Sequence, residues 1–352
     1  DYSGGKYWSD VARKIIKSHP KKNKVSELRT EVLLHVSIDI YFMPPRDISS
    51  ILMNCYHDAM KIGQVDSALI SLFLAWRFRL LGGHNLSMIL QFFKDRGKLT
   101  ANHSKFITTF VILDAMLLKE LTGQSIDCFS VFGDSICSLD DLRSEAESSH
   151  DNRWLRNFHV IKMLTAYWRG DYMAADDHFH ATLTCPTAKM PQIHSIYHTF
   201  FGGLLALHLH RQVGSNDDQR LNQGRQMMEK FETWAQNSLP VFENKWLLLK
   251  AEYCASVGEH ENTQLLYKAS IKSAQDHGNI HELALAFELL GNYYCYHGHD
   301  VDSNECFRKA CVYYKQWGAT AMVEKLMRKH SLRMEPDAFS ELQVGKSKNP
   351  RE

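Results

Sequence analysis

The sequence predicts an all-α fold in which paired antiparallel helices stack into a solenoid. Apolar residues recur at helical spacing through most of the 352 residues, and no alternation of apolar and polar residues persists long enough to indicate a sheet. Only 8 prolines and 19 glycines interrupt the chain, so long stretches are free to be helical. A third observation, a repeated spacing of small residues, predicts how the helices pair.

This repeat has four points: a glycine, a small residue five positions later, a large apolar residue at nine and a second small residue at twelve. It occurs as Gly63-Ala68-Leu72-Ala75, Gly170-Ala175-Phe179-Thr182, Gly258-Thr263-Tyr267-Ser270 and Gly298-Ser303-Phe307-Ala310. We expect the glycine to end one helix in a left-handed conformation and the small residues to let the next helix pack closely against its partner. Ala310 and Ala269 are therefore expected where helices touch. Four copies favour a stacked helical repeat, and so an interaction surface.

The first expected helices cover 6–18, 25–41, 47–61, 65–81, 85–96 and 102–121, where apolar positions at helical spacing lie between breakers. Pro45 disfavours helical geometry at Pro44, so the second and third helices separate there, and Asp47 can cap the third. Gly82 and Gly83 close the fourth. These helices form a predicted set of N-terminal repeats, 1–137.

The remaining expected helices cover 153–169, 172–184, 192–212, 218–237, 241–257, 260–276, 280–297, 301–317 and 319–330. Gly278 ends the helix that holds Tyr267, and Gly298 ends the one that holds Tyr293. They form predicted C-terminal repeats, 153–332. The polar segment 138–152 between the two sets is expected as a surface loop, and 333–352 as a flexible tail.

Composition and charge exclude several classes of protein. The 41 basic and 40 acidic side chains nearly cancel, which gives no general reason to bind nucleic acid or an anionic membrane. The most apolar run, Phe106 to Leu121, is too short to span a bilayer and carries Asp114. The eight cysteines form no C-x-x-C pair and are expected as buried hydrophobes in a reducing, cytoplasmic compartment. Because the chain begins at Asp1 without a signal peptide or initiator Met, we expect a fragment of a longer protein.

Aromatic and small positions of the C-terminal part coincide with the pattern of one family: Trp234-Ala235 through Pro240, Asn244-Lys245, Ala251-Glu252, Tyr267 with Ala269 and Ile271, Tyr313-Tyr314 and Trp317-Gly318-Ala319. With them the chain resembles the tetratricopeptide-like region of very large signalling proteins. Those proteins carry a kinase-like module and an ATPase upstream, and often a sensor histidine kinase downstream. The segment 43–83 resembles an earlier part of the same region. The resemblance implies a regulatory, partner-sensing role without chemistry of its own, although Thr263 and Ser303 replace the more usual Ala.

Motifs for chemistry are weak. His194 and His198 are four apart on an expected helix and could share a metal ion, but no Glu follows His194 as in a zinc hydrolase. The run from Gly345 to Ser347 echoes the end of a phosphate-binding loop without its first glycine or a preceding strand. Neighbouring carboxylates such as Asp176-Asp177 and Asp140-Asp141 point apart on a helix and are interpreted as solvent-facing. We therefore expect no catalytic, cofactor or metal residues.

Two functions remain open. The aromatic clusters Tyr293-Tyr294-Tyr296 and Tyr313-Tyr314-Trp317 are expected mostly in the core, with the remainder lining a groove that takes a protein or peptide partner or a neighbouring module of the same polypeptide. The alternative is a small-ligand sensor or enzyme with a pocket between helices. A long shallow groove would favour the first function, and a deep cavity ringed by polar groups would favour the second.

Overall fold

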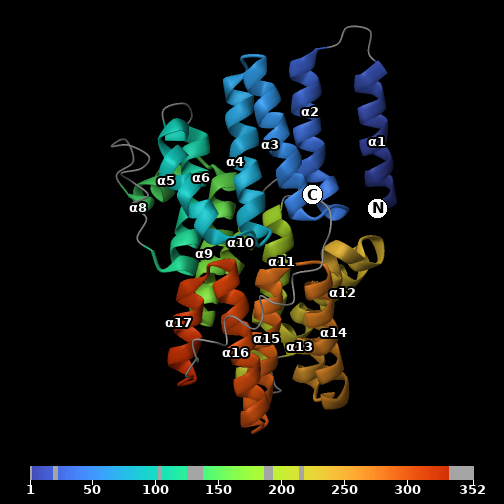
Figure 1. Ribbon diagram of the computed structural model, residues 1–352, viewed down its shortest axis with the longest axis vertical. Coiled ribbons are helices and arrows are strands. Elements are labelled where there is room, and N and C mark those ends of the chain that lie inside the picture. The colour runs from blue at the N-terminus through green and yellow to red at the C-terminus, as the bar shows by residue number, and fades with distance from the viewer. Residues whose placement is uncertain are drawn as a thin grey trace.

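The computed structural model describes residues 2–18, 23–101, 105–124, 138–185, 193–213 and 218–332. All regular secondary structure in these ranges is helical, which confirms the all-α prediction (Figure 1). The expected tail, with Gly345 to Ser347, lies outside the described residues. The elements are α1 Tyr2–Ser18, α2 Lys24–Ser37, the 3-10 helix η1 Asp39–Tyr41, α3 Pro45–Lys61, α4 Val65–Leu81, α5 Leu86–Ala101, α6 Lys105–Thr122, α8 Leu139–Ser148, α9 Asn152–Arg169, α10 Tyr172–Leu183, α11 Ile193–Val213, α12 Asp218–Asn237, α13 Leu239–Val257, α14 His260–Asp276, α15 Ile280–Tyr296, α16 Asp300–Trp317 and α17 Thr320–Lys329.

Each copy of the repeat forms one helical hairpin: α3 with α4, α9 with α10, α13 with α14, and α15 with α16. The four glycines of the pattern all have positive φ angles, between 71° and 89°, and Gly170 and Gly258 end their helices in the left-handed conformation as expected. The small and large residues of every copy are at most 3% exposed. The predicted register is therefore confirmed.

One packing prediction is wrong. Ala310 is fully buried, but Ala269 is exposed. The inward position belongs to its neighbour Ser270, whose hydroxyl donates to the carbonyl oxygen of Asn244 on the facing helix at 2.8 Å. Adjacent residues on a helix point in different directions, so a shift of one position exchanges a contact for solvent.

In two of the repeats the large residue packs onto a glycine of a neighbouring helix. A Cβ atom added at Gly291 on α15 would lie 2.7 Å from the ring of Phe307, and one added at Gly202 on α11 would lie 2.4 Å from the ring of Phe179. Distances this short are not tolerated between carbon atoms, so the missing side chain is what lets each ring reach the helix backbone. These contacts set how closely α16 approaches α15 and how closely α10 approaches α11.

Two predicted boundaries change in the structure. The polar segment 138–152 is not a loop, because it contains α8, whose first turn is capped by Ser138 accepting from the backbone N–H of Asp141 at 3.1 Å. Only Leu142 and Ala146 are buried on this helix, and two apolar positions are too few to reveal a helix by periodicity. The expected helix 25–41 is interrupted after Ser37 and continues as η1.

Hairpins that are far apart in the sequence lie against each other. Figure 1 shows α15 to α17 below α4 to α6. Arg46 donates to the carbonyl oxygens of His277 and Gly278 at 2.8 and 2.9 Å, and Thr320 donates to that of Thr122 at 2.6 Å. The acceptors lie at or just after helix ends, where carbonyl groups lack helical partners. In a simple solenoid each helical pair contacts only its sequence neighbours, so these bonds depart from that arrangement.

Buried polar contacts also hold the hairpins together. Lys245 on α13 donates to Glu282 on α15 at 2.9 Å, and both side chains are nearly inaccessible. Burial opposes ionisation of Glu282, but the charges of Lys245 and His281 lower its pKa to about 2. Tyr197 on α11 donates to the carbonyl oxygen of Leu81 at the end of α4. Among the residues that the structure describes, one hydrophobic core extends from Val32 to Leu332.

Candidate functional site

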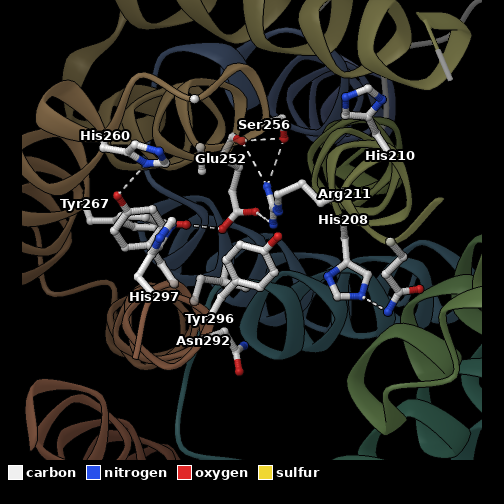
Figure 2. Close-up of a pocket in the computed structure, with 15 residues that line it drawn as sticks. His208, His210, Arg211, Glu252, Ser256, His260, Tyr267, Asn292, Tyr296 and His297 are labelled. Carbon is white, nitrogen blue, oxygen red and sulfur yellow. Dashed lines mark hydrogen bonds and ion pairs between the residues drawn. The ribbon is translucent and has the colours of Figure 1, made fainter. Parts of the chain in front are cut away.

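A cavity of about 840 Å³ opens between α11, α13, α14 and α15, and we call it the Arg211 cavity. Figure 2 shows its lining, which comes from the last turns of α11, α13 and α15 and from one face of α14. The α13–α14 and α15–α16 turns place these helix ends at the same level. The pairing of the repeat therefore brings side chains from four helices to one opening.

At the floor of the cavity, two opposite charges pair with each other. Arg211 on α11 forms an ion pair with Glu252 on α13, and its Nη1 also donates to the Glu252 carbonyl oxygen and to Ser256 Oγ, each at 3.0 Å. The hydroxyl of Tyr267 on α14 donates to the other carboxylate oxygen of Glu252. Glu252 is 2% exposed, so its charge depends on these two partners. Burial and this carboxylate raise the pKa of Tyr267 well above its usual value.

Three rings form the wall nearest the α15–α16 turn. His260 Nδ1 lies 3.1 Å from the hydroxyl oxygen of Tyr293. The ring of His297 lies edge-on to that of His260 with centroids 4.7 Å apart, and 4.5 Å from that of Tyr293. Burial, and then the neighbouring His260, lower the pKa of His297. Tyr296 stands at the mouth of the cavity with 83% of its surface exposed.

The opposite wall is built around His208 on α11. Its Nε2 lies 3.0 Å from the amide nitrogen of Gln212, and its ring packs on Tyr172 with centroids 4.0 Å apart. Burial, and then the positive charge of Arg211, lower the pKa of His208 to about 4. This imidazole is therefore uncharged at neutral pH.

The chemistry of the cavity suits recognition. The hydrogen bonds of Ser256 run to Arg211 and to the Glu252 carbonyl oxygen at 2.8 Å, so neither of them joins it to an imidazole base. Glu252 is the one carboxylate in the lining formed by described residues, and both of its oxygens already accept hydrogen bonds. What remains for a ligand is a set of ring faces, imidazole and amide groups, and the outer edge of Arg211.

His194 and His198, the candidate metal pair, have separate surroundings on α11. His198 Nε2 lies 2.7 Å from Thr182 Oγ1, and its ring stacks on Phe179. His194 is buried beside Arg77, and burial followed by that charge lowers its pKa well below the usual value. Among the described residues, no cluster of three or more His, Cys, Asp or Glu side chains has a geometry suited to a metal ion.

The aromatic clusters divide between core and cavity. Tyr293, Tyr294, Tyr314 and Trp317 are buried, whereas Tyr296 is exposed. Tyr314 donates to Glu288 at 2.6 Å, and Tyr313 stacks on Phe287 with centroids 5.7 Å apart. Of these residues, Tyr293 and Tyr296 line the Arg211 cavity.

Two other expectations concerned the neighbouring carboxylates and the cysteines. Asp176 is not solvent-facing, because it is 8% exposed and accepts from Arg220 at 2.9 Å; Asp177, Asp140 and Asp141 are exposed as expected. The cysteines of the described residues are free thiols, and all but Cys295 are buried. Cys128 and Cys137 lie outside the described residues.

The cavity residues Arg211, Glu252, His260 and His297 were not predicted as a site. Glu252 appears in the sequence analysis only as part of the family resemblance, and Tyr267 only there and as the large residue of one repeat. The available signal was a charged residue inside an apolar helical stretch, as at Arg211 and Glu252. That signal does not name the partner on another helix.

The chain matches no family model, no curated protein and no solved structure. Within the part of the chain that the structure describes, no helix combines the length and apolar character needed to cross a membrane.

Proposed function

We propose that this chain is a non-catalytic regulatory module of a larger cytoplasmic signalling protein, and that it senses a ligand in the Arg211 cavity. The observation that carries the proposal is the cavity itself. Its volume of about 840 Å³ falls within the range of roughly 300–1,000 Å³ found for small-molecule sites. Its polar groups converge from several helices, which favours a ligand sensor over an extended groove.

We further propose that the hairpins are tetratricopeptide-like repeats that form a closed solenoid. The register of small and large residues in four hairpins supports this architecture. Residues that carry the family resemblance also lie in the internal network, because Tyr267 donates to Glu252 and Asn244 to Glu282. In such a repeat, ligand binding between hairpins changes how they stack and so biases attached modules.

Interaction with a protein partner is a second candidate, favoured by a different surface. On α1, Tyr7, Trp8 and Ile15 expose 62%, 65% and 59% of their surface. Large apolar side chains gathered on one helix are common where proteins associate. A neighbouring module of the same polypeptide would be held there while the cavity receives the ligand.

The proposal is tested by filling the cavity. Asn292 lines it and is half-buried, so Asn292→Trp should occupy its volume, whereas Asn54→Trp on an exposed face of α3 is the matched control. Pools of metabolites are screened by native mass spectrometry and thermal shift. We expect a compound that stabilises the wild type and the control but not Asn292→Trp, and that is recovered with unchanged mass.

Three results would contradict the proposal. They are a ligand that binds Asn292→Trp equally well, chemical conversion of the bound compound, and the absence of any binder that the cavity-filled variant loses. Conversion would favour the enzyme alternative, because a non-catalytic module returns its ligand intact.

A further inference from the structure

The unsatisfied hydrogen-bonding capacity of the Arg211 cavity is mainly that of donors. A guanidinium group has five N–H donors. The bonds of Arg211 to described residues use three of them, two on Nη1 and one on Nη2. The side chain keeps 29% of its surface exposed and lines the cavity. The opposing carboxylate of Glu252 has no comparable free edge, since it is 2% exposed and accepts from both Arg211 and Tyr267.

The other polar groups of the lining also favour a negatively charged ligand. His208, His260 and His297 surround the floor on two sides, and an imidazole donates from one nitrogen when neutral and from both when protonated. Arg211 and Glu252 cancel each other, so a bound anion meets donors without displacing an existing charge. A bound cation finds no carboxylate oxygen in this lining that lacks a partner.

The aromatic rings of the lining indicate which shape of ligand fits the cavity. Tyr293, His260 and His297 pack against one another on one wall, and His208 packs on Tyr172 on the other. Tyr296 stands exposed at the mouth. Rings on two sides of a cavity stack on a planar ligand and contribute affinity through burial of both faces.

We propose that the Arg211 cavity binds a small aromatic anion, a planar ring system carrying one carboxylate or phosphate group. The anionic group accepts from Arg211 and the surrounding imidazoles, and the ring lies between the aromatic walls. This inference rests on the proposed function, because it names the ligand class of the same site. A carboxylate and a phosphate share this chemistry, and the experiment separates them.

Matched probes measure the charge preference. Indole-3-acetate, indole-3-acetamide and tryptamine present one ring with an anionic, neutral or cationic group, and adenosine monophosphate with adenosine forms the phosphate arm. We expect calorimetry to show that one of the two anions binds at least tenfold more tightly than its neutral counterpart, the difference expected for a hydrogen bond to a charged group. Tryptamine should bind most weakly.

The variants test which residues provide the preference. Arg211→Gln combined with Glu252→Gln removes both charges together, so that neither is left buried and unpaired. We expect the anion and its neutral counterpart to bind this double variant with similar affinity. His260→Gln should weaken the anion severalfold, whereas His57→Gln, at an exposed position on α3, should not. Circular dichroism and thermal midpoints check that each variant is folded.

The outcomes separate this inference from the proposed function. Equal binding of anion and neutral probe, or an anion preference that survives in the folded double variant, overturns the inference while a cavity-directed ligand can still be found. If no aromatic probe binds but another compound or a peptide is lost in Asn292→Trp, the inference fails and the proposed sensing role stands. If nothing binds in the cavity, both fail.

Discussion

Arg77 and Asp114 form an ion pair inside the hydrophobic core. The Nε and Nη2 atoms of Arg77, on α4, each approach a carboxylate oxygen of Asp114, on α6, to 2.9 Å. The two side chains are 5% and 3% exposed. The guanidinium group also lies 4.5 Å from the ring centroid of Phe73. The charge that interrupts the most apolar stretch of the sequence is thus matched by a charge from another hairpin.

Removing one member of this pair should destabilise the chain strongly. Asp114→Asn leaves Arg77 charged and buried, so the free energy of unfolding should fall by about 3–5 kcal/mol in urea titrations. Glu147→Gln on α8 is the control, because its pair with Arg143 is half exposed and should be worth less than about 0.5 kcal/mol. Similar losses for the two variants would contradict the role assigned to the buried pair.

The repeat register predicts different results for two alanines. Ala310 is fully buried between α15 and α16, whereas Ala269 is exposed on α14. Ala310→Phe should therefore cost about 1–3 kcal/mol by overpacking, and Ala269→Phe should change stability by less than about 0.5 kcal/mol. Thermal and urea unfolding measure both. An unchanged Ala310→Phe would mean that the observed register does not limit packing.

Gly202 should not tolerate a methyl group. A Cβ atom there would lie 2.4 Å from the ring of Phe179, whereas one at Gly5 on α1 would find its nearest neighbour at 3.8 Å. Gly202→Ala is expected to destabilise by about 1–3 kcal/mol through overpacking. Gly5→Ala should instead stabilise by up to about 1 kcal/mol, because alanine favours a helix. Equal effects in calorimetry would show that Phe179 can move away.

Stability should fall as the pH drops from about 6.5 to about 4. Burial, and then the charge of Arg156, lower the pKa of His198 from 6.5 to about 4. The unfolded chain therefore binds the proton first, and between these values it holds more protons than the folded chain, so acid favours unfolding. Above pH 6.5 this contribution is fully present, and it is lost as pH falls through the window.

The variant His198→Gln removes that titration. Urea midpoints measured from pH 7.5 to 4 should decline less steeply in this variant than in the wild type, although His84, His159 and His208, whose pKa values are also lowered to about 4, keep part of the slope. His57→Gln, at an exposed site, is the control. A slope unchanged by His198→Gln would show that its burial does not perturb its ionisation in the folded chain.

Deleting residues 298–352 should affect the N-terminal half as well. The deletion removes the bonds from Thr320 to Thr122 and from Lys325 to the carbonyl oxygen of Trp168, which are 2.6 and 2.7 Å long. Hydrogen exchange should therefore show lost protection near the ends of α6 and α9. Helix α3 should stay protected, because Arg46 keeps its acceptors His277 and Gly278. Unchanged protection in α6 would contradict the closure of the fold.

The sequence by itself determined most of the secondary structure and the pairing of helices within the four hairpins. Glycine turns, small residues and apolar periodicity act over fewer than about twenty residues, so they can be recognised in the sequence alone. The four hairpins and the burial of Leu72, Phe179, Tyr267 and Phe307 follow from that local pattern. Helix α8 was not predicted, because it buries only Leu142 and Ala146.

Only the tertiary structure decided how the hairpins close and where the cavity lies. Arg46 and Gly278 are bonded across 232 positions, and Arg211 and Glu252 across 41. The local pattern does not specify such partners. An arginine can donate equally well to many different carbonyl or carboxylate oxygens, so its sequence position does not identify the acceptor. The partner is determined when the helices pack, because a buried charged side chain then has only one group close enough to bond.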